Sequence, residues 1–87
     1  MTKDELIRTI NADKEYHMIE FGLSEEEARN IVKENYVLNY IYGDIDEEEF
    51  LGLINEMGYE VENMKALRDE RESRKIRLEI RKYMEAK

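Results

Sequence analysis

The chain alternates between apolar stretches with helical spacing and short segments that carry glycine or clustered charge. In residues 47–57, Phe50, Ile54 and Met57 fall on one face of a helix, and Leu51 and Leu53 widen that face. Residues 25–42 begin with a narrow apolar stripe and then become apolar on nearly every side, at Tyr36, Val37, Leu38, Tyr40, Ile41 and Tyr42. A helix that is apolar all round is buried, so this stretch is predicted to be the central helix.

Helix boundaries are marked by capping residues and by glycines. The segments TKDE at 2–5, SEEE at 24–27 and DEEE at 46–49 each place a short oxygen-bearing side chain three residues before a glutamate. In this arrangement the first side chain accepts from a free N–H of the first turn, and the glutamate reaches back to the cap. Gly22, Gly43 and Gly58 follow apolar segments, as glycines do where a helix ends in a left-handed residue. These signals predict helices near 3–21, 25–42 and 47–57, with a weak point in the first around Asn11–Asp13.

Two short segments also have the composition of a strand. Residues 36–42 are rich in Tyr, Val and Ile, and Ile76, Leu78 and Ile80 alternate with charged residues. The cap and the glycine around the first segment favour helix, and so do the Lys, Arg and Glu around the second. The fold is therefore predicted to be all-α, with three short-to-medium helices in a hairpin-like arrangement plus a long charged C-terminal helix.

The C-terminal segment differs because its apolar positions begin late. The run RDERESRK at 68–75 contains no apolar residue, so we expect a solvated helix that does not bind the core. Ion pairs four residues apart would support it, at Lys65–Asp69, Arg68–Glu72 and Glu70–Arg74. Beyond this run lies an apolar stripe of Ile76, Ile80, Tyr83 and Met84.

This pattern predicts a compact helical body over 1–60 and a protruding C-terminal segment over 61–87, helical over roughly 61–86. The stripe is the candidate oligomer interface, because it lies far from the other apolar residues of the chain. We expect the same helix of a second copy to cover it, as in a coiled coil.

Charge is divided unevenly between the two parts. The 87 residues have a net charge of −8, but residues 1–64 carry 5 basic and 17 acidic side chains, and residues 65–87 carry 9 basic and 5 acidic ones. The body is thus acidic, at −12, and the tail is basic, at +4. A chain of this length forms one small domain with a limited core, so a partner would add to its stability.

The chain has no cysteine and no apolar leader at its N-terminus. It also lacks a run of the ~18–20 apolar residues that span a bilayer. We therefore expect a soluble, cytoplasmic protein without a membrane partner.

The acidic segment GDIDEEEF, residues 43–50, resembles the second half of an EF-hand calcium loop. The resemblance implies that Gly43 forms the sharp turn and that Glu49 is the bidentate calcium ligand. The first half of such a loop needs Asp or Asn oxygens at the positions where this chain has Leu38, Tyr40 and Tyr42. Because these side chains offer no anionic oxygen, we interpret the segment as a helix start and predict no metal site.

The segment FGLSEEEARNIVKE, residues 21–34, resembles the turn and second helix of a helix-turn-helix, with Gly22, Leu23, Ser24, Ala28 and Ile31 at matching spacing. The resemblance implies that the helix after the turn reads DNA. That helix opens with three glutamates, residues 25–27, whose carboxylates repel phosphates. We therefore predict a generic corner between two helices.

Residues for catalysis are sparse. His17 is the single histidine, and in a chain without cysteine it has no second group for a zinc site or a nucleophile–base pair. Tyr36, Tyr40 and Tyr42 lie among apolar and acidic neighbours, which predicts core packing. We predict no enzymatic activity and no cofactor.

The sequence favours a non-enzymatic protein-interaction or regulatory protein that acts as a homodimer. One alternative is an acidic inhibitor whose body imitates the charge of DNA and binds a basic nuclease or nucleic-acid-binding protein. A second alternative is weak nucleic-acid binding through the tail, at Arg71, Arg74, Lys75, Arg77 and Arg81. Acidic residues are mixed into that segment, so we favour self-pairing.

Overall fold

A computed structural model describes residues 1–86, which form four helices and no strand. α1 spans Lys3–Phe21, α2 Glu25–Ile41, α3 Glu47–Glu56 and α4 Met64–Glu85. The predicted all-α class is confirmed, with helix at both segments of strand-like composition, while residue 87 of the predicted C-terminal segment lies outside the described residues. α1 continues without a break through Asn11–Asp13 and, at 19 residues, is nearly as long as α4 at 22.

Capping explains where the helices begin and end. The side chains of Thr2, Ser24 and Asp46 each accept a hydrogen bond from the backbone N–H three residues later, as predicted. Glycines 22, 43 and 58 have φ of 63°, 83° and 85°, left-handed values that glycine adopts without strain. α4 begins later than predicted because the side chain of Asn63 caps it by accepting from the Ala66 N–H.

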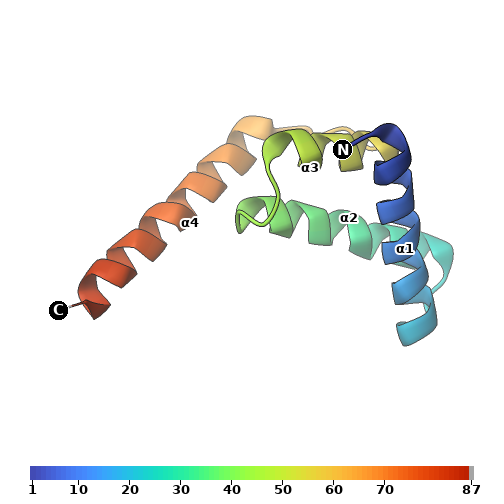
Figure 1. Cartoon of the computed structure of the whole chain (residues 1–87), viewed down its shortest axis with the longest axis horizontal. Coiled ribbons are helices and arrows are strands. Elements are labelled where there is room, and N and C mark those ends of the chain that lie inside the picture. The colour runs from blue at the N-terminus through green and yellow to red at the C-terminus, as the bar shows by residue number, and fades with distance from the viewer. Residues whose placement is uncertain (87) are drawn as a thin grey trace.

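α2 is the central helix and contacts each of the other three (Figure 1). α1 crosses α2 steeply before the turn at Gly22, and α3 runs back along α2 after the turn at Gly43. α4 begins beside the α2–α3 pair and leads away from it, so that its C-terminal end stands apart from α1. The corner predicted at Gly22 and the hairpin predicted at Gly43 are therefore present.

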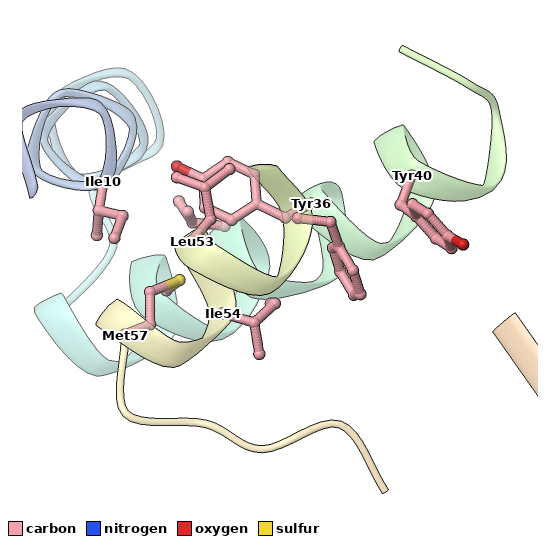
Figure 2. Packing of buried hydrophobic residues seen from close by; sticks show 8 residues of the cluster. Ile10, Tyr36, Tyr40, Leu53, Ile54 and Met57 are labelled. Atoms are coloured by element: carbon pink, nitrogen blue, oxygen red, sulfur yellow. The ribbon is translucent and has the colours of Figure 1, made fainter. Parts of the chain in front are cut away.

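The core lies between α1, α2 and α3. Figure 2 shows its buried side chains, which are Ile10, Val32, Tyr36, Tyr40, Phe50, Leu53, Ile54 and Met57. All except Ile10 come from α2, α3 or the C-cap of α3, which confirms the predicted central helix and the predicted face of α3. The prediction that the end of α2 is buried on nearly every side is wrong at two positions. Leu38 is 43% exposed, and Tyr42 is 49% exposed because it is the C-cap of α2 at the edge of the body.

Candidate functional site

The N-terminal half of α4 is attached to the body by three arginines at three-residue intervals, Arg68, Arg71 and Arg74, which we call the arginine ladder. Arg68 donates twice to the Glu47 carboxylate at the start of α3, with Nε–Oε1 at 2.6 Å and Nη2–Oε2 at 2.9 Å. Arg71 donates from Nη1 to the backbone carbonyl of Ile45 at 2.8 Å. These contacts fix the first three turns of α4 against α3 and the turn before it.

The ladder also stacks on tyrosines of α2. The Arg71 guanidinium lies 4.6 Å from the centre of the Tyr40 ring, and that of Arg74 lies 4.1 Å from the centre of the Tyr42 ring. Guanidinium groups are attracted to aromatic faces and keep part of their hydration there, so this contact needs no apolar side chain on α4.

Tyr40 joins the ladder to the core. Its side chain is buried and stacks on Phe50, with ring centres 4.9 Å apart, and its hydroxyl donates to Glu47 Oε1 at 3.2 Å. Burial, together with the hydrogen bond to Glu47, raises the pKa of Tyr40. The hydrogen bonds from Arg68 lower the pKa of Glu47, so this carboxylate is held charged between Tyr40 and Arg68.

The expectation that residues 68–75 do not bind the core is therefore wrong. A segment without apolar residues is attached through guanidinium groups that reach a carboxylate, a carbonyl and two aromatic rings. Arg68 pairs with Glu47 instead of Glu72, which was the predicted partner. Within the described residues the i,i+4 ion pair is Arg81–Glu85, at 3.5 Å.

The distal half of α4 has two unlike faces. Each residue advances a helix by about 100°, so residues 71, 74, 75, 78 and 82 share one side. On that side they line an open groove against the C-terminal end of α2, together with Ile41, Tyr42 and Gly43, and Glu72 and Glu79 also line it. Ile80 follows Arg71 by about two and a half turns and therefore lies on the opposite face, away from the body.

That outward face carries the predicted interface residues. Ile76, Ile80, Tyr83 and Met84, which we call the outer stripe, are 47%, 54%, 64% and 69% exposed. They span about two turns of a helix that has no buried residue between Met64 and Glu85. The structure thus brings the four residues together on one surface, and leaves that surface uncovered by the body.

The five basic residues considered for nucleic acid divide between two sides of α4. Arg71 and Arg74 are engaged with the body, and Lys75 lines the same groove. Arg77 lies on the outward side and Arg81 pairs with Glu85 on the helix itself. The five therefore do not form one continuous basic face.

The acidic segment 43–50 serves as the turn and cap before α3. The Asp46 carboxylate accepts from the Glu49 N–H at 2.8 Å, which confirms the capping interpretation. Across residues 1–86, no three His, Asp or Glu side chains gather as a group that could hold a metal ion. His17 packs at the α1–α2 crossing, where Nδ1 donates to the Asp13 carbonyl at 2.8 Å.

Two features were missed by the sequence reasoning. The first is the arginine ladder, whose signal is the three-residue spacing of Arg68, Arg71 and Arg74. The second is an exposed aromatic cluster at the end of α1, where Phe21 contacts the Tyr16 and His17 rings at 6.1 and 5.7 Å between ring centres. Its signal is the run YHMIEF at 16–21, which has more apolar positions than one buried helix face can hold.

Comparison of the chain with known protein families, with curated proteins and with solved structures finds no match. Among the helices that the structure describes, none combines the length and the apolar content needed to cross a membrane.

Proposed function

We propose that the chain is a non-enzymatic protein-interaction protein that acts as a homodimer, with the outer stripe of α4 as its self-association surface. The observation that carries the proposal is the orientation of the stripe. Four large apolar side chains lie on the face of α4 opposite the body, and each is about half exposed or more. Contiguous apolar surface of this kind marks interaction sites in soluble proteins.

The size of the stripe sets the expected affinity. Fully burying an Ile or Met side chain contributes about 1.5–3 kcal/mol, so covering one that is half exposed contributes roughly 1 kcal/mol. Eight such side chains in a dimer give a gross gain of roughly 8 kcal/mol. Association itself costs about 4–15 kcal/mol, so the stripe alone leaves at most roughly 4 kcal/mol and supports a weak dimer, with a dissociation constant of about 1 mM.

The test is sedimentation equilibrium of the full chain from about 20 µM to about 2 mM, a range chosen to cover this affinity. We expect the wild type to shift from monomer to dimer across the range, and the Ile80→Glu variant to stay monomeric because a charge is placed in the contact. Ile19→Glu is the matched control, since Ile19 is 70% exposed on α1, a helix that makes no contact with α4 within the described residues.

Two results would contradict the proposal. A wild type that is monomeric at about 2 mM lacks the predicted association, whatever the variants do. A dimer that Ile80→Glu leaves unchanged, or that Ile19→Glu disrupts equally, uses a surface other than the outer stripe.

A further inference from the structure

The outer stripe falls into a heptad register. With Ile80 at position a, Ile76 and Tyr83 occupy the two neighbouring d positions, and Ser73 occupies the a position one heptad earlier. The side of α4 opposite this seam lines the groove against α2, through Arg74 and Leu78 among others. The seam therefore faces outward while the body covers the other side of the helix.

The residues flanking the seam differ in charge. The g positions hold Glu72 and Glu79, which lie between the groove side and the seam and also line the groove, and the e position between them holds Arg77. In a parallel pair of helices, a g residue lies beside the e residue five positions later on the partner helix, so Glu72 meets the partner's Arg77, twice by symmetry. In an antiparallel pair, e positions face e positions and g positions face g positions, so the glutamates of one helix lie beside the glutamates of the other.

We propose that two copies of the chain pair in parallel through residues 73–84 of α4, with Glu72 of each copy beside Arg77 of the other. The inference rests on the homodimer proposed above and adds its orientation and register. Charge complementarity across the seam selects the parallel pair, because the antiparallel one brings no Glu–Arg pair together between residues 72 and 86.

The position of the body is compatible with this arrangement. Each body lies against the groove side of its own α4, so in the dimer the two bodies are on opposite outer sides of the helix pair. Two helix diameters, about 20 Å, then separate the two acidic bodies. That distance exceeds the Debye length of about 8 Å at physiological salt, so their repulsion is largely screened.

A cysteine-scanning experiment tests the orientation, since the chain has no cysteine of its own. In the parallel dimer the two Ser73 positions face each other across the seam, within reach of a disulfide. In an antiparallel pair centred on Ile80 they lie about 20 Å apart along the axis. We expect Ser73→Cys to form a covalent dimer with oxidised glutathione, and Lys75→Cys, two residues away on the groove side, to remain monomeric under the same treatment.

A charge-exchange series tests the register. Arg77→Glu places like charges at both interchain contacts and is expected to weaken dimerisation about tenfold, and the double variant Glu72→Arg/Arg77→Glu is expected to restore it. Arg81→Glu is the matched control, because it makes the same change of charge at a position outside the flanks of the seam. Sedimentation equilibrium measures all four proteins.

The outcomes separate the two proposals. Suppose that the wild type is a dimer and that the Ile80→Glu variant is a monomer, but that Ser73→Cys forms no covalent dimer. The parallel arrangement is then overturned and the homodimer stands. The same holds if the double charge exchange fails to restore what Arg77→Glu lost. An assembly that is a trimer through the stripe overturns both proposals. If the wild type is monomeric at about 2 mM, both proposals fall together.

Discussion

α3 and α4 follow one another along the chain but are held in place by different contacts. α3 has 10 residues and buries Phe50, Leu53 and Ile54, whereas α4 has 22 residues and buries none. The position of α3 depends on apolar surface removed from water, which salt does not screen and which does not titrate. The position of α4 depends on guanidinium contacts at the edge of the body and, in its first turn, on the partly buried Met64 and Leu67, which pack against the core.

The difference shows how a small chain divides stability from recognition. Apolar residues of α2 and α3, with Ile10 of α1, form the core, and Met64 and Leu67 at the start of α4 pack against it. The apolar residues of the distal half of α4 remain on the surface, where they serve the proposed dimer. Exposed ion pairs contribute little and are screened by salt, so α4 is expected to detach from the body at a lower free energy than the body needs to unfold. Substitutions in the core of the body are therefore expected to have larger effects on stability than substitutions in the contacts of α4.

The largest effect is expected in the core of the body. Phe50 is fully buried, and Phe50→Ala should lower the free energy of unfolding by about 3–5 kcal/mol, because it removes the ring and leaves a cavity. Phe21 is 61% exposed, so Phe21→Ala should stay within about 0.5 kcal/mol of the wild type. Urea denaturation followed by circular dichroism measures both variants. Similar losses in the two would show that the core is not centred on Phe50.

A smaller, local effect is expected at the arginine ladder. Arg71→Met keeps the aliphatic stem but removes the hydrogen bond to the Ile45 carbonyl and the stacking on Tyr40, at a cost of about 1–2 kcal/mol. Amide hydrogen exchange should speed up in α4 and change little in α2. Arg81→Met is the control on the same helix, where the ion pair with Glu85 is exposed. Equal exchange in the two variants would mean that the ladder does not hold α4.

Most of the fold could be predicted from the sequence because its signals are local. Ser24 and Asp46 cap helices through hydrogen bonds that span three residues, and Gly43 and Gly58 close helices by their own conformation. The helical spacing of the apolar residues in α3 likewise predicts which face of the helix is buried, without knowledge of what covers it. Such features depend only on residues that are close together in the sequence.

The contacts of α4 could not be predicted in the same way, because they join residues far apart in the chain. Arg68 and Glu47 are 21 positions apart, and Arg71 and the Ile45 carbonyl are 26 positions apart. A charged run offers many ion pairs of similar energy, and the prediction that Arg68 pairs with the acidic residue four positions later was wrong. The outer stripe was visible as a pattern, but its direction relative to the body follows only once the ladder fixes the rotation of α4.

The smallest expected effect is a dependence on pH of the attachment of α4, which distinguishes α4 from α3. The hydrogen bonds from Arg68 hold the pKa of Glu47 below its ordinary value of 4.5. A carboxyl whose pKa is lowered by folding stabilises the folded state above its unfolded pKa, and this contribution is lost as pH falls through the folded value. Protection of α4 amides from hydrogen exchange should therefore decline below about pH 4.5 relative to that of α3, after correction for intrinsic exchange rates.

Two variants assign this decline to Glu47. Glu47→Gln removes the titrating group, so its α4 should be less protected than the wild type at pH 6 and should show a smaller further loss on acidification. Glu48→Gln makes the same change one residue along, at an exposed side chain in the same first turn of α3, and should retain the wild-type profile. If Glu48→Gln flattens the profile as much as Glu47→Gln does, the acid sensitivity comes from the acidic turn as a whole. The Arg68–Glu47 pair would then not be the contact that distinguishes the attachment of α4 from the packing of α3.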